Sequence, residues 1–318
     1  MRRLSKLLCF VSGVLAAGVV HAGQAEEAYK RGDYATAVEL WSVMANTGDA
    51  EAEDNLGTAY AEGHGVTQDY GQAAAWYRKA ADQGDAQAEH NLGSIYDRGL
   101  GVKQDFAEAA IWFRKAADQG LAVAQTNLGL LYRDGRGVPQ DYIQSAAWLR
   151  KAADQGTAIA QYFLGLAYAK GQGVTQDYLE AIAWYRKAAE QGNVFAEHDL
   201  GVAYAEGLGV TLDYAQAVSW FQKAADQGNA GAEYDLGVSY YKGLGVPLDY
   251  VQAVAWLRKS ADQGYAKAEN SLGVAYLDGH GVKQDTAQGF TLIRKAADQG
   301  DPTAKANLIK LEPPPKKA

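Results

Sequence analysis

Histidines are the side chains of this 318-residue chain that most readily suggest metal or acid–base chemistry. Beyond residue 21 there are four, and they fall at fixed places in a pattern that recurs along the chain: His64, His90, His198 and His280. His90 and His198 share one place in that pattern, and His64 and His280 share another. A metal site needs ligands that converge on one point, whereas equivalent places in distant repeats stay apart. We therefore expect polar surface or groove residues and no metal ligand.

Nucleophilic catalysis finds no support in the sequence. Cys9 is the only cysteine, and the patterns G-x-S-x-G and H-E-x-x-H are absent. Loops such as Gly171–Gly173 contain G-x-G, but no strand precedes them, so a turn is favoured over a phosphate site. We expect no catalytic residue, no cofactor and no metal, and hence no enzyme.

Two further patterns suggest binding, and each has a plainer interpretation. The recurring RKAADQG, first seen at Arg78, is a helix end and a joint. Its basic residues form a docking stripe or, as we favour, a solvated face. Tryptophan recurs at one place in six repeats and would suit a ladder for sugars or nucleic acid. Leu292 stands at that place in the last repeat, which favours packing between repeats.

The elements that carry these residues follow from an internal repeat. A leucine recurs every 36 residues, and in seven complete units Gly follows it at once and Tyr follows that Gly by three. The leucines are Leu56, Leu92, Leu128, Leu164, Leu200, Leu236, Leu272 and Leu308. The seven units occupy residues 50–301 without insertion.

Each unit predicts two helices. The first, helix A, carries an apolar stripe at helical spacing in residues 50–62, and glycines after it indicate a loop. The second, helix B, opens at Asp69, with Gln72 three residues later as in a capping box. A glycine in the middle of helix A costs about 1 kcal/mol relative to alanine. We therefore expect it to allow close approach to the alanine-rich face of helix B.

Stacked helix pairs predict an all-α solenoid. We expect residues 23–49 to form a shortened N-terminal capping unit that resembles a tetratricopeptide repeat. Residues 302–311 should form a C-terminal capping helix, and residues 312–318 a disordered tail.

The phrase LG-x-x-Y-x-x-G-x-GV-x-x-D-[YF], followed by A-x-x-[WYFL]-x-[RK]-AA-x-QG, resembles the Sel1-like repeat, a relative of the tetratricopeptide repeat. The resemblance covers residues 50–311. It implies antiparallel helix pairs in a right-handed superhelix and a scaffold or adaptor role in envelope assembly, signalling or host contact. Some exported relatives carry cysteine pairs and β-lactamase labels, and this chain has no such pair.

Positions that vary between units are the ones that packing does not explain. If helix A lines the groove, the second, fifth, ninth and twelfth residues of helix A face it. These residues are polar in the first two units and apolar or aromatic from the third to the sixth, which predicts a protein-binding groove. The alternative is that they bury one another. The candidate residues are Leu130, Ile159, Tyr162, Leu166, Phe195, His198, Val202, Tyr234, Val238 and Tyr241.

The first 22 residues resemble a cleaved Sec-type signal peptide, with Arg2, Arg3 and Lys6 before an apolar run. Its loss changes the net charge from −8 to −11, because three positive charges are removed. This acidic balance disfavours nucleic acid as a partner. We expect a periplasmic or secreted protein with no integral membrane segment after cleavage, while the sequence sets no oligomeric state.

The sequence thus predicts a non-enzymatic scaffold that holds a protein or peptide segment in its groove. The alternative is a β-lactam or peptidoglycan hydrolase of the exported Sel1-repeat type.

Overall fold

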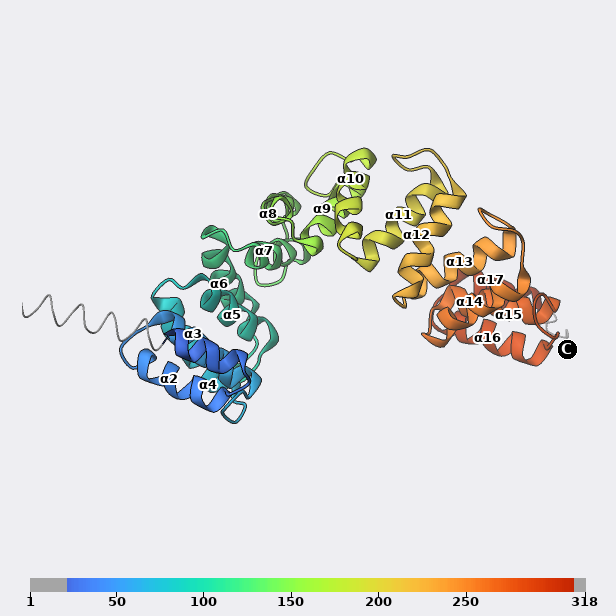
Figure 1. Cartoon of the computed structure of the whole chain (residues 1–318). Helices are drawn as coiled ribbons and strands as arrows, with labels where there is room; N and C mark the ends of the chain where they lie inside the picture. The colour runs from blue at the N-terminus through green and yellow to red at the C-terminus, as the bar shows by residue number, and fades with distance from the viewer. Residues whose placement is uncertain (1–21, 312–318) are drawn as a thin grey trace, which may run out of the picture. The chain divides into compact units, whose positions relative to one another are not determined.

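The computed structural model describes residues 22–311, and every regular element among them is an α-helix (Figure 1). The expected signal peptide, apart from Ala22, and the expected C-terminal tail lie outside these residues. None of the described helices is both long and apolar enough to cross a bilayer. The described chain divides after Thr157 into two compact units, which are treated separately.

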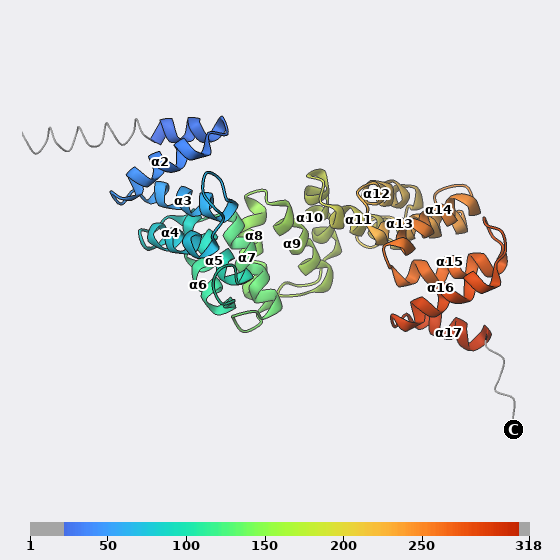
Figure 2. The same cartoon turned by 90° about the horizontal axis from the view of Figure 1, so that it is seen from below.

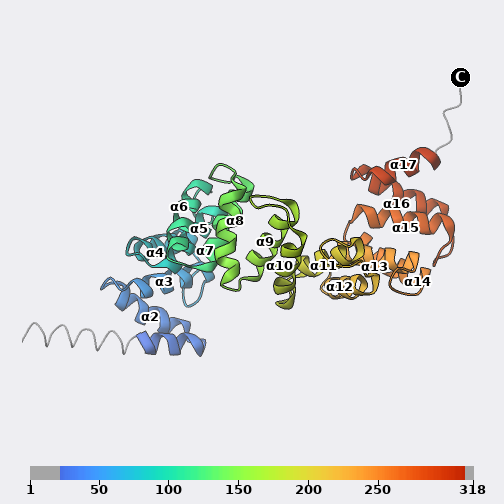
Figure 3. The ribbon, with the colours of Figure 1, turned by 90° about the horizontal axis from the view of Figure 1, so that it is seen from above.

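Both units alternate A and B helices, and consecutive helices pack side by side (Figures 2 and 3). The first unit contains a helix over residues 22–30, then α2 (Tyr34–Ala45), α3 (Ala50–Glu62), α4 (Tyr70–Asp82), α5 (Ala86–Arg98), α6 (Phe106–Asp118), α7 (Ala122–Asp134) and α8 (Tyr142–Asp154). The second contains α9 (Ala158–Lys170), α10 (Tyr178–Glu190), α11 (Val194–Glu206), α12 (Tyr214–Asp226), α13 (Ala230–Lys242), α14 (Tyr250–Asp262), α15 (Ala266–Asp278), α16 (Thr286–Asp298) and α17 (Pro302–Leu311). The A helices are those with odd numbers from α3 to α17.

Local sequence signals set the ends of these helices. The Asp213 carboxylate accepts hydrogen bonds from the backbone N–H groups of Ala215 and Gln216, and the equivalent aspartates cap the other B helices. In the loop before α14, Gly245 has φ +72°, and a Cβ there would lie 2.2 Å from the Tyr214 carbonyl oxygen of the preceding repeat. Because Gly245 has no side chain, the loop backbone can lie directly against the backbone of the preceding repeat.

The glycine inside helix A has a packing role, but its partner differs from the expected one. A Cβ on Gly201 would lie 2.4 Å from Phe221, and one on Gly165 would lie 2.7 Å from Tyr185. The glycine thus lies beneath the large side chain eight places into helix B, rather than against alanines alone. The Ala217 carbonyl oxygen, 3.2 Å from the same point on Gly201, shows that the backbones are also close.

A half-buried hydrogen bond joins the two helices of each of the seven repeats. Gln227, just after α12, donates to the Glu197 carboxylate in the first turn of α11 at 2.6 Å. Glu197 is buried, and this burial raises its pKa although Lys223 and Gln227 act in the opposite direction. Glu197 therefore links the two helices of its repeat, and we call this hydrogen bond the internal clip. The seven donor–acceptor pairs are Gln83–Glu53, Gln119–Glu89, Gln155–Gln125, Gln191–Gln161, Gln227–Glu197, Gln263–Glu233 and Gln299–Glu269.

Removal of this clip is expected to destabilise the second unit. Gln227→Ala leaves the buried Glu197 without its amide donor, which should cost about 1–3 kcal/mol of unfolding free energy. Gln222→Ala is the control, because Gln222 donates to Asp226 on the exposed face of the same helix. Urea unfolding at pH 7 measures both changes. Equal losses for the two variants would show that the clip contributes nothing beyond an exposed hydrogen bond.

The RKAADQG segment contacts the next repeat and is also partly open to solvent. Arg78 Nη2 donates to the Tyr96 hydroxyl of the next repeat at 2.8 Å, and its guanidinium lies 4.7 Å from the Trp112 ring. Lys79 Nζ lies 3.6 Å from the Trp76 ring in a cation–π contact that five other repeats share. Arg78 therefore belongs to a joint between repeats, whereas Lys79 remains exposed to solvent.

The tryptophans pack between repeats, as we expected. Trp112 is buried in one cluster with Ala73 and Leu92. In the last complete repeat, Leu292 packs on the cluster around Leu257, so leucine substitutes for tryptophan there. This apolar role accounts for the ladder without a sugar or nucleic-acid ligand.

Candidate functional site

The candidate groove residues lie on one face of the A helices, here called the A face: the second, fifth, ninth and twelfth residues of each A helix. Leu130 lies on α7 in the first unit, and the other candidates lie on α9, α11 and α13 in the second. Half-buried candidates outnumber exposed ones in the second unit. The half-buried ones are Tyr162, Leu166, His198, Val202, Tyr234, Val238 and Tyr241.

A partly exposed apolar cluster lies on α9 and α11, the first two A helices of the second unit. Ile159 on α9 is 51% exposed and Phe195 on α11 is 56% exposed. The ring of Tyr162 lies 5.8 Å from that of Phe195, 5.9 Å from that of Tyr185 and 5.0 Å from that of Phe163. Tyr162 is thus partly covered by its neighbours, whereas Ile159 and Phe195 stay open to solvent.

The fifth residue of one A helix contacts the sixth residue of the next. His198 Nε2 lies 2.8 Å from the Asp235 carboxylate, and its Nδ1 lies 3.6 Å from Asp199. In the first unit, His90 Nε2 lies 3.2 Å from the Asn127 amide nitrogen. The interpretation of these two histidines as simple surface polar residues is therefore incomplete, because each one joins neighbouring A helices.

Different partners give these two histidines opposite pKa directions. Burial acts to lower the pKa of His198, but the hydrogen bonds and charges of Asp199 and Asp235 outweigh it and raise the pKa to about 9. Burial lowers the pKa of His90, whose neighbour Asn127 carries no charge. At neutral pH, His198 is therefore an imidazolium held by two carboxylates, and His90 is neutral.

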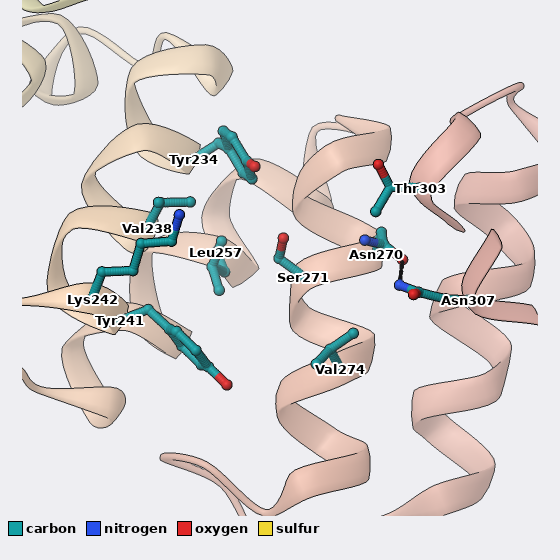
Figure 4. A pocket seen from close by; sticks show the side chains of 10 residues that line it. All are labelled: Tyr234, Val238, Tyr241, Lys242, Leu257, Asn270, Ser271, Val274, Thr303 and Asn307. Carbon is teal, nitrogen blue, oxygen red and sulfur yellow. Dashed lines mark hydrogen bonds between the residues drawn. The ribbon is translucent and has the colours of Figure 1, made fainter. Parts of the chain in front are cut away.

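A pocket of about 380 Å³ lies between α13, α15 and α17 (Figure 4). Val238, Leu257 and Val274 supply apolar surface, and Tyr234 and Tyr241 flank it. Its remaining lining is polar: Lys242, Asn270, Ser271, Thr303 and Asn307. Three of the sequence candidates, Tyr234, Val238 and Tyr241, thus share one site.

The two pocket tyrosines are fixed by contacts on their far sides. The Tyr241 hydroxyl lies 2.7 Å from His280 Nδ1, and the His280 ring stacks on Tyr250 at 4.4 Å. The Tyr234 ring lies 5.5 Å from that of Tyr265. These contacts hold the two tyrosine rings in place, so the rings form fixed walls of the pocket.

Leu130 lines a separate, smaller pocket of about 110 Å³ in the first unit. Its neighbours there include Ser94, Asp97, Arg98 and Arg136, so the site is more polar than the one beside Tyr234.

Sequence reasoning missed Lys242, Thr303 and Asn307 as pocket residues. Lys242 is the thirteenth residue of its A helix, one beyond the last place assigned to the A face. The thirteenth residue of helix A varies in charge between repeats, from Glu62 to Lys242. This variation was the sequence signal that could have identified Lys242.

Within residues 22–311, no three or more His, Cys, Asp or Glu side chains gather so that they could hold a metal ion. The A face offers exposed rings, an apolar pocket and fixed amides, which are the features of a recognition surface.

Comparison with a family model decides the classification. The Sel1 repeat model matches residues 50–85, 86–121, 122–157, 158–193, 194–229, 230–265 and 266–301. The chain belongs to the Sel1 repeat family. The resemblance expected from the sequence is confirmed, as is the all-α repeat fold. Sel1 repeat proteins generally serve as scaffolds for protein interactions.

Several solved structures resemble this Sel1 repeat protein, including one from Escherichia coli and one from Oxalobacter formigenes. A protective antigen of uropathogenic Escherichia coli with the same fold is 41% identical, with a TM-score of 0.78 over 86% of this chain and 59% of that one. A Sel1 repeat protein from Oxalobacter formigenes is 34% identical, with a TM-score of 0.70 over 92% of this chain and 90% of that one. This chain therefore spans less than two thirds of the Escherichia coli antigen. No curated protein matches it.

Proposed function

We propose that this protein is a non-enzymatic scaffold that holds a segment of a partner protein on the A face of its fourth to seventh repeats. The observation that carries the proposal is the pair of open apolar side chains, Ile159 and Phe195, on the same face as the pocket at Tyr234. Exposed apolar surface of this kind usually marks a contact site.

The location of the proposed activity is the periplasm or the cell exterior. The basic and apolar pattern of the first 22 residues supports export, and the absence of cysteine beyond Cys9 suits an oxidising compartment. We place the partner in that compartment, in envelope assembly, signalling or host contact.

A photocrosslinking amino acid tests the face directly. Placed at Phe195, it is expected to crosslink a discrete partner in the native envelope fraction, because that side chain is 56% exposed on the A face. Placed at Leu179, which is 71% exposed on a B helix, it should give no such product. Equal products at both positions, or none at Phe195, would contradict the proposal.

A substitution at the same residue tests the proposal through the affinity for the partner. Phe195→Ser is expected to weaken capture of the crosslinked partner at least about tenfold, since aromatic interface residues commonly contribute about 1–2 kcal/mol or more. Its melting temperature should stay near that of the wild type, because the ring is largely exposed. Phe195 serves better here than Tyr162, whose contacts with Tyr185 and Phe163 make its loss a packing defect as well.

A further inference from the structure

The pocket between α13, α15 and α17 has polar side chains with unused hydrogen-bond donors and acceptors. These groups indicate one kind of occupant. Only 6% of the Asn270 surface is exposed. Its Oδ1 accepts a hydrogen bond from Asn307 Nδ2 at 2.9 Å. This bond leaves the Asn270 amide nitrogen as a donor and the Asn307 carbonyl oxygen as an acceptor. In Figure 4 the Asn270 nitrogen turns away from Asn307, toward the space that faces α13.

A free donor beside a free acceptor matches a peptide group, which offers one C=O and one N–H. An occupant that accepts from the Asn270 amide nitrogen and donates to the Asn307 carbonyl oxygen gains affinity and direction. The adjoining apolar surface of Val238, Leu257 and Val274 suits an aliphatic side chain on the same segment.

Lys242 sets the charge of the occupant. It lines the pocket at the end of α13, and Figure 4 shows its side chain running back along the helix toward Val238. The ammonium group therefore favours a carboxylate on the partner.

We propose that this pocket binds an extended internal segment of a partner protein, with an aliphatic side chain on Val238 and Val274, a main-chain amide on the Asn270–Asn307 pair, and an Asp or Glu side chain at Lys242. This assignment rests on the proposed function and specifies the chemistry of its partner. We choose a side-chain carboxylate over a chain terminus because Phe195 and Ile159 extend the binding face beyond the pocket, so the segment continues past it.

Selection from a displayed library of random 12-residue peptides, flanked at both ends by the display protein, tests the proposal. Peptides retained by the wild type are expected to share an aliphatic residue near an Asp or Glu. Selection on Lys242→Glu should replace the acidic residue with Lys or Arg. Lys170→Glu is the matched control, because Lys170 ends α9 at the same repeat position and lies outside the pocket, and its selected peptides should keep the acidic residue.

Affinity measurements on one selected peptide, acetylated and amidated at its ends, complete the test. Asn307→Leu is expected to weaken its binding about tenfold or more, as loss of a buried hydrogen-bond partner commonly does. Since Asn307 is only half-buried, its melting curve reports separately on folding.

The outcomes separate the two proposals. Peptides that bind, lose affinity with Phe195→Ser and ignore Lys242→Glu and Asn307→Leu would overturn the pocket assignment and leave the A-face scaffold standing. Binding only by peptides with a free C-terminal carboxylate would overturn the internal-segment assignment. If no peptide is retained and no partner crosslinks at Phe195, both proposals fail.

Discussion

Replacement of His198 with asparagine is expected to cost up to about 3 kcal/mol of unfolding free energy at pH 6 and much less at pH 9.5. The folded protein holds the pKa of His198 at about 9, above its ordinary value of 6.5, because Asp199 and Asp235 outweigh the effect of burial. A raised pKa means that the folded state binds the proton more tightly than the unfolded state. The stabilisation is therefore complete below pH 6.5 and is lost as the pH rises through 9. At about 1.4 kcal/mol per pH unit, this interval gives the stated magnitude.

Urea unfolding of the wild type and His198→Asn at several pH values between 6 and 9.5 measures the effect, and the two free-energy curves should converge. His90→Asn is the control, since burial lowers the pKa of His90 and keeps it neutral above pH 7. Its difference from the wild type should stay constant above pH 7. Parallel curves for His198→Asn and the wild type would show that His198 is not a bound imidazolium.

The second large effect is expected from Gly201→Ala, which should destabilise the protein by about 1–3 kcal/mol. Helix propensity alone would favour alanine by about 1 kcal/mol. The new Cβ would lie 2.4 Å from Phe221 and 3.2 Å from the Ala217 carbonyl oxygen, so α11 and α12 must separate or the ring must leave its place.

Gly71→Ala is the control, because it measures the effect of helix propensity on stability without the close contact. Gly71 lies in the first turn of α4, and alanine occupies the equivalent place in α6 and α12, at Ala107 and Ala215. This control is expected to be neutral or to stabilise by up to about 1 kcal/mol. Thermal unfolding of both variants gives the comparison, and a Gly201→Ala variant as stable as the wild type would refute the close-packing role.

Much of the fold was predictable because its signals are local and recur. The aspartate caps, the helix-ending glycines and the apolar stripes each act within about one turn of helix, so one repeat contains the information for all. The close approach at Gly201 was also expected from its energetic cost, but its partner was not. Phe221 is 20 residues away, and only the helix crossing shows that its ring, rather than an alanine, covers the glycine.

The site was less predictable because its chemistry arises between repeats. His90 and His198 are equivalent in sequence, yet their pKa values move in opposite directions because of the next residue, Asn91 or Asp199, and the residue 37 positions later, Asn127 or Asp235. The same offset joins Asn270 to Asn307 and so creates the free amide in the pocket. A repeat-by-repeat comparison treats each unit alone and therefore does not reveal such pairs.

The joint at Gly245, where a loop lies against the Tyr214 backbone, has a consequence for how such a chain can change over time. Backbone atoms are the same in every repeat, so this joint carries no information about which repeat follows which. A whole 36-residue module can be duplicated, lost or exchanged while each new boundary keeps the old geometry. The recognition surface can then be rearranged in modules, independently of the scaffold that displays it.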